Sequence, residues 1–101
     1  MNTILIIGID TENGIKLYQN LNNKDKEKNY KIYGTYTPQK LQAMPYNYYP
    51  LDINNQEQLY EIIQWVMPNE LFCFSSDKNI VINVLEKYNL SIIVKEIESE
   101  I

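Results

Sequence analysis

Hydrophobic residues are arranged along this chain in short uninterrupted runs, separated by stripes with helical spacing. The runs over residues 3–9 and 71–74 are typical of strands that are covered on both faces. Residues 30–36 alternate in polarity and are rich in tyrosine, which also indicates a strand, and residues 90–97 supply a last one. A further short strand that includes residues 46–49 is expected in a stretch punctuated by three prolines, Pro38, Pro45 and Pro50.

Three helices are predicted between these strands, each with one apolar face. The first spans residues 14–21. The second begins at Asn54, which caps it, with Glu57 completing a capping box. The third starts at residues 75–77 and stops at Asn89, which tolerates the left-handed conformation. The expected apolar faces consist of Ile15, Leu17, Tyr18 and Leu21, then Leu59, Ile62, Ile63 and Val66, and finally Ile80, Val81, Val84, Leu85 and Tyr88.

The order of these elements predicts the fold class. Strands alternate with helices along most of the chain, which indicates an α/β fold with a mostly parallel sheet, helices on both faces and right-handed crossovers. Residues 22–29 are polar and alternate in charge, so we expect a solvated connection there, as a surface loop or a frayed helix end. No repeat is visible, and residues 1–101 are expected to form a single domain.

Composition narrows the chemistry that this domain can perform. The net charge is -4, which disfavours nucleic-acid binding, and all nine cationic residues are lysines. Without Arg or His, the bidentate phosphate clamp and the commonest general base and metal ligand are missing. Cys73 lies between two phenylalanines and is expected to be an inert buried thiol. No apolar run approaches the roughly 20 residues of a membrane helix, and the N-terminus lacks a signal peptide's basic flank, so a cytoplasmic protein is expected.

The first strand runs into a turn that carries the most specific pattern in the chain. Gly8 and Gly14 flank this turn, Thr11 stands between them, and Asp10 and Glu12 lie beside Thr11. In a Rossmann domain such a turn holds the pyrophosphate of a dinucleotide, and a middle glycine lets the backbone approach it. Thr11 takes that middle position here. The two carboxylates favour the helix dipole, but each would repel a nearby phosphate by on the order of one to a few kcal/mol.

Three segments together carry a family resemblance. Residues 7–17 hold the glycine turn, residues 50–59 begin with Pro-Leu-Asp-Ile and continue into a helix, and residues 68–76 run from Pro-Asn-Glu to two serines. In this order they resemble the extended short-chain dehydrogenases/reductases, the family of nucleotide-sugar dehydratases, epimerases and reductases. The resemblance covers most of residues 1–76. It implies a three-layer Rossmann-like domain with sheet order 3-2-1-4-5, in a chain that stops before the family's catalytic part.

The resemblance also implies cofactor-binding positions. Gly8 and Gly14 match the first and third turn glycines, and Thr11 stands in place of the second. Asp52 and Ile53 match the pair that contacts adenine. The small residues beside the nicotinamide ribose are matched by Ser75 and Ser76. Two interpretations of the glycines stay open, a tight turn without a ligand and a retained nucleotide contact.

Two features count against catalysis and against tight dinucleotide binding. The family's catalytic Tyr-x-x-x-Lys has one counterpart, from Tyr36 to Lys40, but it follows the second strand and Pro38 breaks its helical spacing. We interpret this string as a coincidence. The second strand ends in Thr35 and Tyr36, where an acid usually holds the adenine ribose.

Aromatic residues gather in the same part of the chain. The cluster consists of Tyr33, Tyr36, Tyr46, Tyr48 and Tyr49. These rings either cover a sheet edge or form a patch that faces a partner, because tyrosine is enriched at interfaces. Trp65, late on the second helix, either anchors such a contact or is partly buried in the core.

These observations lead to a functional hypothesis with named alternatives. The sequence predicts a non-catalytic Rossmann-like module that binds a protein partner or a second copy of itself, as a regulatory subunit or an inhibitor. No cofactor, metal, nucleic acid or membrane contact is expected. The alternatives are a protein that binds NAD(P) or another nucleotide, and one chain of a split nucleotide-sugar-modifying enzyme. Whether the chain is an enzyme stays uncertain, although activity on its own is not expected.

Overall fold

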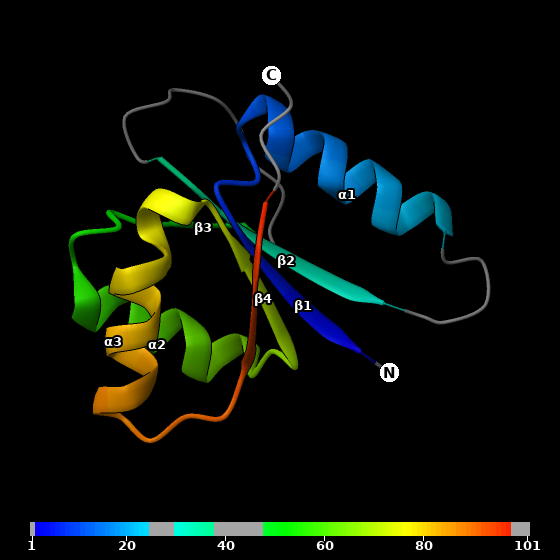
Figure 1. Ribbon diagram of the computed structural model, residues 1–101. Helices are drawn as coiled ribbons and strands as arrows, with labels where there is room; N and C mark the ends of the chain where they lie inside the picture. The colour runs from blue at the N-terminus through cyan, green and yellow to red at the C-terminus, as the bar shows by residue number, and fades with distance from the viewer. Residues whose placement is uncertain (1, 25–29, 38–47, 98–101) are drawn as a thin grey trace.

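The computed structural model describes residues 2–24, 30–37 and 48–97 of the chain. Within them, five strands form one parallel sheet in the order β3-β2-β1-β4-β5, which confirms the predicted order. The strands are β1 (Thr3–Ile7), β2 (Lys31–Tyr36), β3 (Tyr48–Pro50), β4 (Glu70–Cys73) and β5 (Ile93–Glu96). Figure 1 shows the sheet between helices on its two sides, so the domain is a three-layer α/β fold of the Rossmann-like type.

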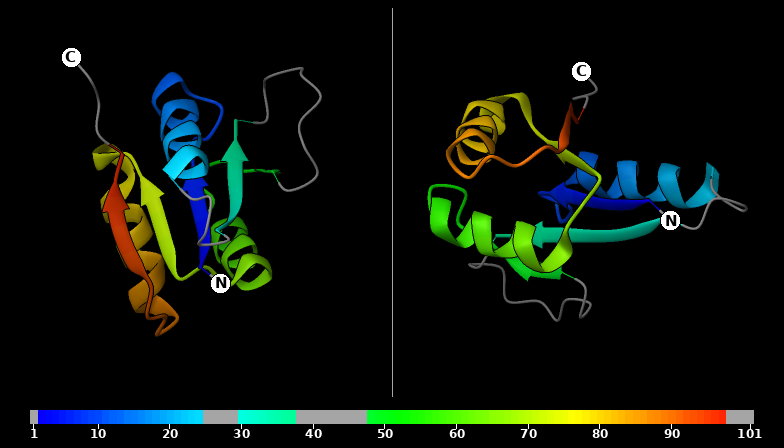
Figure 2. Two further views of the ribbon diagram at one scale, coloured as in Figure 1. Left: turned by 90° about the vertical axis from the view of Figure 1, so that its right-hand side faces the viewer. Right: turned by 90° about the horizontal axis from the view of Figure 1, so that it is seen from below.

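Helices cover both faces of the sheet. α1 (Glu12–Lys24) lies on one face, and α2 (Gln56–Val66) and α3 (Lys78–Lys87) lie side by side on the other (Figures 1 and 2). A 3-10 turn, η1 (Ser75–Asp77), leads into α3. The rings of Tyr60 and Tyr88 stack with their centroids 3.6 Å apart and join α2 to the end of α3.

The central strand β1 is buried on both faces, which explains its uninterrupted apolar run. Ile4 and Ile6 belong to the core under α1. Leu5 and Ile7 belong to the larger core under α2 and α3. Successive side chains of a strand point to opposite faces, so one strand supplies both cores.

The cap of α2 lies one residue later than predicted. The side-chain oxygen of Asn55, not Asn54, accepts a hydrogen bond from the Gln58 backbone N–H at 3.1 Å. The N–H of Asn54 instead donates to the Asp52 carboxylate at 3.0 Å. The predicted capping box with Glu57 is therefore wrong, because the turn that Asp52 forms with Asn54 places Gln58 at the third helical position.

The predicted first helix is too short, and one of its core residues is wrong. α1 continues to Lys24, so residues 22–24 belong to the end of the helix and not to a loop. Ile15 is 45% exposed. Gly14 faces the sheet in the first turn, which directs its neighbour Ile15 outward and leaves the packing to the residues further along, Leu17, Tyr18 and Leu21.

The end of α3 agrees with the sequence prediction, whereas some predicted segments lie outside the described residues. Asn89 has a φ of 54°, which confirms the left-handed stop after α3. Residues 25–29, 38–47 and 98–101 lie outside the described part of the chain, and Lys40 and Tyr46 are among them. No helix in the described ranges has the length and apolar character needed to cross a membrane.

Candidate functional site

The turn after β1 depends on its two glycines for contacts inside the protein. Gly8 has a φ of +85°, and a Cβ placed on it would lie 2.9 Å from Cε2 of the Phe74 ring. A Cβ on Gly14 would lie 2.2 Å from the carbonyl oxygen of Gly8, far inside van der Waals contact. Only glycine allows α1 to approach the end of β1 so closely. The turn itself therefore requires both glycines, whatever a ligand needs.

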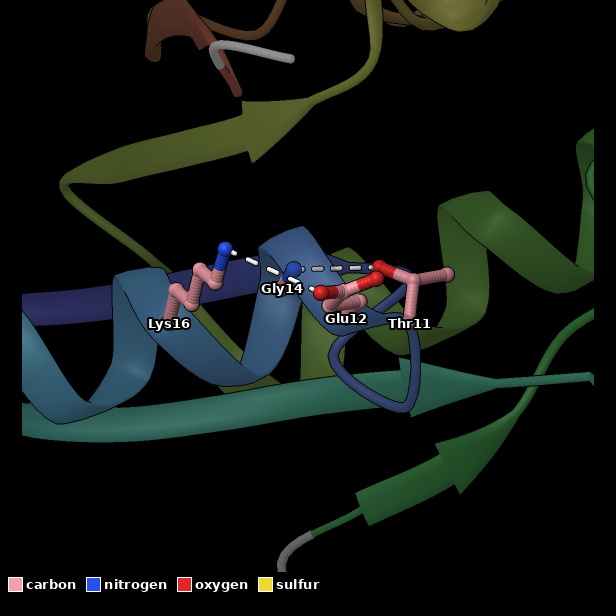
Figure 3. A network of polar contacts seen from close by, with 4 residues as sticks. All are labelled: Thr11, Glu12, Gly14 and Lys16. Carbon is pink, nitrogen blue, oxygen red and sulfur yellow. Dashed lines mark hydrogen bonds and ion pairs between the residues drawn. The ribbon is translucent and has the colours of Figure 1, made fainter. Parts of the chain in front are cut away.

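Thr11 closes the turn with its own hydroxyl group (Figure 3). This hydroxyl donates to the carbonyl oxygen of Gly8 at 2.6 Å and accepts the N–H of Gly14 at 3.0 Å. The Thr11 N–H also donates to the Gly8 carbonyl, and the Ile15 N–H donates to the Thr11 carbonyl at 2.8 Å. Thr11 therefore acts as the N-cap of α1, because its oxygen satisfies an amide that the helix leaves without a partner.

Thr35 holds the turn from the neighbouring strand, a role that the sequence reasoning missed. Its side chain is buried, and its hydroxyl accepts the N–H of Gly8 at 3.1 Å. Its carbonyl accepts the N–H of Ile9 at 3.0 Å. The sequence feature that could have identified Thr35 is a small polar residue at the end of a buried strand. The backbone amides around the turn that donate within the protein include those of Gly8, Ile9, Thr11, Gly14 and Ile15.

A cleft of about 450 Å³ opens beside the turn, at the carboxyl ends of β1, β2 and β4. Open α/β sheets bind their ligands at this edge, where the strand order reverses. The predicted cofactor-binding residues that line the cleft are Gly8, Thr11, Asp52 and Ile53. Gly14 and Ser75 are not in its lining, because Gly14 is buried against Gly8 and Ser75 is exposed in η1. Ser76 is likewise exposed in η1.

The cleft contains side chains that the sequence reasoning did not assign to the site. Phe74 and Asp77 line it from the segment after β4, and Tyr36 lines it from the end of β2. Their positions follow from the topology, since the carboxyl ends of neighbouring parallel strands meet at one edge of the sheet. The strand order could therefore have identified these side chains, because it predicts that the residues that end or follow neighbouring strands lie close together.

The charged groups of the cleft are acidic. Asp52 and Asp77 line it, and no lysine of the described residues does so. Burial raises the pKa of the Asp77 carboxyl above its usual range. In the turn itself, both carboxylate oxygens of Asp10 are shielded from solvent. The Glu12 side chain is 85% exposed and lies 3.7 Å from the Lys16 ammonium (Figure 3).

The fold implies a dinucleotide, and the turn does not fit its pyrophosphate. A Rossmann turn offers backbone amides and a helix N-terminus to the phosphates, with no side chain at the middle position. Here the Thr11 side chain stands at that position, and the amide of Gly14 donates to it. Within the described part of the chain, no group of three acidic or cysteine side chains is placed to hold a metal ion.

A second feature is an aromatic stripe on the α2 side of the sheet, made of Tyr33, Tyr49 and Trp65. The rings of Tyr33 and Tyr49 stack with centroids 6.4 Å apart, and the Trp65 ring lies 5.9 Å from that of Tyr49. The two tyrosines are half-buried, whereas Trp65 is 64% exposed. The ammonium of Lys31 lies 5.5 Å from the centre of the Tyr33 ring.

The predicted tyrosine cluster is therefore divided between different sites. Tyr33 and Tyr49 belong to the aromatic stripe, Tyr36 lines the cleft, and Tyr48 packs against the core under α1. Tyr46 lies outside the described residues, as does Lys40 at the end of the Tyr-x-x-x-Lys string.

Comparison with known proteins places the chain by its fold. No protein-family model matches it, and no curated protein does. Among solved structures it is similar to L-threonine 3-dehydrogenase from Trypanosoma brucei, with a TM-score of 0.63 and 14% sequence identity. The match covers 93% of this chain and 36% of that enzyme, so the chain spans about a third of the enzyme's length. At this identity the likeness shows the shared Rossmann-like fold alone.

Proposed function

We propose that this domain is a non-catalytic interaction module, a divergent relative of the cofactor-binding half of the extended short-chain dehydrogenases/reductases. It binds a protein partner or a second copy of itself. The observation that carries this proposal is the glycine turn, in which the Thr11 hydroxyl stands at the position of the middle glycine and bonds to Gly8 and Gly14. The scaffold is kept, while the side chain that replaces the middle glycine is used to hold the turn together.

The aromatic stripe supplies a surface for such an interaction. Trp65 is 64% exposed and Met67, two residues later, is 77% exposed. Tyrosine and tryptophan dominate the binding energy of many protein interfaces, because they bury a large area with few rotatable bonds. The net charge of -4 favours a protein partner over nucleic acid.

Light scattering during gel filtration, over a range of protein concentrations, tests this proposal together with affinity capture from a native cell extract. The informative variant is Trp65→Ala, and the control is Glu86→Ala at an exposed position on α3. We expect the wild type and the Glu86 variant to form the same dimer or complex. The Trp65 variant should lose it.

Two results would contradict the proposal. One is a wild-type protein that stays monomeric at every concentration and captures no protein. The other is a complex that forms equally well with Trp65→Ala and with Glu86→Ala, which would place the interface elsewhere or show a non-specific contact.

A further inference from the structure

β5 is the outermost strand of the described sheet on the side of α3 (Figure 2). From this edge we infer that the chain pairs with a second copy of itself. The two β5 strands lie antiparallel across a two-fold axis, which joins two sheets into one. The surface differs from the aromatic stripe, so the inference goes beyond the proposed function and does not rest on it.

The first argument concerns the backbone of β5. The amides of Ile93 and Ile97 donate to carbonyl oxygens on the β4 side, at 3.3 and 2.8 Å. Alternate residues of a strand direct both their N–H and their C=O to the same neighbour, so those of Val94 and Glu96 point away from β4. Among the described residues, no strand pairs with this outer side of β5. An edge of this kind is a template for another strand.

The opposite edge of the sheet is protected against such pairing. β3 has three residues and ends in Pro50. The amide of Leu51 donates to the Tyr36 carbonyl at 3.0 Å, so Leu51 faces β2 and its neighbour Pro50 faces outward. Proline offers no N–H to an added strand. Pairing of β5 with β3 of the next copy, which would continue into fibres, is thereby disfavoured, whereas a two-fold pair of β5 strands closes on itself.

The second argument concerns the side chains on the two sides of β5. On one side, Ile93 is 59% exposed. On the other side, a groove of about 520 Å³ lies between β5 and α3, and its apolar lining includes Ile82, Leu90, Ile92 and Val94. The side chains of an added strand alternate between these two sides. A second β5 brings isoleucine and valine to both of them, so the strand has the apolar pattern that its own edge accepts.

The third argument concerns charge. Lys78 and Glu86 both line the groove, and the Lys78 ammonium lies 3.3 Å from the Glu96 carboxylate at the end of β5. An antiparallel copy reverses the two ends of the groove, so the Lys78 of each copy approaches the Glu86 of the other. Exposed ion pairs contribute little, so this contact mainly orients the pair. Glu86→Ala should therefore weaken the pairing by no more than about fivefold.

The same charges define the register of the two strands. The two groove charges are about 12 Å apart along α3, which corresponds to about four residues of a strand. Counted back from Glu96, the midpoint of this distance lies at Val94. In the antiparallel pair, Val94 then lies opposite Val94 of the second copy, and Ile93 lies opposite Lys95. No like charges face each other across this pair of strands.

Hydrogen exchange of the backbone amides, followed by NMR on the full chain, tests this inference. In a monomer the outward amides of Val94 and Glu96 exchange from the folded state, whereas strand pairing protects them. We expect a dissociation constant of about 100 µM or lower. Raising the protein from about 50 µM to about 1 mM should then slow the exchange of both amides by about fourfold, because the monomer fraction falls.

Matched variants assign this protection to the edge. Ile93→Lys places a cation opposite Lys95 of the second copy, at a position exposed enough to leave the fold intact. Ile15→Lys is the control, because it makes the same change at a position on α1 that is 45% exposed. The concentration dependence should be lost in the first variant and retained in the second.

A second edge variant keeps the test decisive if Ile93→Lys does not fold. Glu96→Pro removes one outward N–H and leaves the inward amides of β5 paired with β4. It should abolish the concentration dependence at Val94. Trp65→Ala should leave this dependence unchanged, because the aromatic stripe is a different surface.

Three results would overturn the inference. The first is exchange of Val94 and Glu96 that does not depend on protein concentration. The second is an equal loss of protection in Ile93→Lys and Ile15→Lys. The third is protection that appears only when another protein is added, which would make a partner's strand the occupant. A chain that captures a partner through Trp65 but lacks this protection would retain the proposed function without the inference, and the reverse result would do the opposite.

Discussion

At the glycine turn, the Thr11 hydroxyl bonds to Gly8 and Gly14, the Thr35 hydroxyl accepts the Gly8 N–H, and the Phe74 ring lies against Gly8. At the β3 side of the sheet, by contrast, the aromatic stripe leaves a side chain uncovered, because its Trp65 is 64% exposed. The first region has the sequence pattern of a ligand site, but its polar groups form hydrogen bonds within the protein. The second carries no known motif and leaves an aromatic side chain exposed to solvent.

This difference shows that a sequence pattern can be present for a structural reason, without the function that it usually serves. The turn glycines are explained by close backbone contacts, so their presence does not require a cofactor. The exposed Trp65 is not required by a comparable backbone contact, and we propose that it serves a contact outside the chain. Residues at the turn should therefore matter for stability, and residues of the stripe should matter for association.

The largest effect on stability is expected from Gly14→Ala. Its Cβ would lie 2.2 Å from the Gly8 carbonyl oxygen, and both atoms belong to rigid backbone. We expect a loss of about 3 kcal/mol or more in the free energy of unfolding, measured with urea. Asn20→Ala, at an exposed position on the same helix, is the control and should change the unfolding free energy by no more than about 0.5 kcal/mol. Equal losses would argue against a backbone clash.

The reactivity of the Cys73 thiol measures how well the core at the end of β4 is shielded from solvent. Burial, with smaller contributions from Asp77 and Glu96, raises the pKa of Cys73 to about 11. At pH 8 the thiolate fraction is then about one in a thousand, so its reaction with a thiol reagent should be at least about a hundredfold slower than after unfolding. The native rate should rise steadily with pH up to the pKa. A native rate close to the unfolded one would show that this region opens freely.

A smaller loss is expected when the cap of α1 is removed. Thr11→Ala deletes the hydroxyl that accepts the Gly14 amide and should cost about 1 kcal/mol in unfolding free energy, while Thr11→Ser should retain most of the stability. Thermal unfolding of both variants measures the difference. If alanine and serine were equivalent, the hydroxyl would not be what closes the turn. Neither change should alter the molecular mass in solution.

The smallest effect on stability is expected at the aromatic stripe, where a substitution should impair association instead. Trp65→Ala removes a mostly exposed side chain and should change the unfolding free energy by only about 0.5 kcal/mol. The same variant should lose the complex that the wild type forms. A large stability loss in the monomer would mean that Trp65 serves the core, and the contrast between the two regions would fail.

The fold could be predicted largely from the sequence, because it depends on local patterns. The continuous run through Leu5, the spacing of Leu59 and Ile62, and the left-handed Asn89 each reflect one element and its burial. Errors arose where two neighbours compete for the same role. Asn54 and Asn55 are both good caps, and only the bond from the Asn54 amide to Asp52 decides between them.

The site was less predictable, because it joins residues that are far apart in sequence. Asp52 and Ile53 were identified by resemblance and do line the cleft. Thr35 was missed because its partner, the Gly8 amide, is 27 positions away. Phe74 was missed because its contact with Gly8 depends on the adjacency of β1 and β4.

The closure of the glycine turn against phosphate is the central claim, and NMR of the backbone amides tests it most directly. Inorganic pyrophosphate is added to the isotopically labelled protein, and the amide signals of Gly8, Thr11 and Gly14 are followed. The account predicts that these signals show no saturable shift at millimolar pyrophosphate, because the three amides already donate within the protein. Saturable shifts of the Thr11 and Gly14 amides would contradict it and would show a working phosphate site.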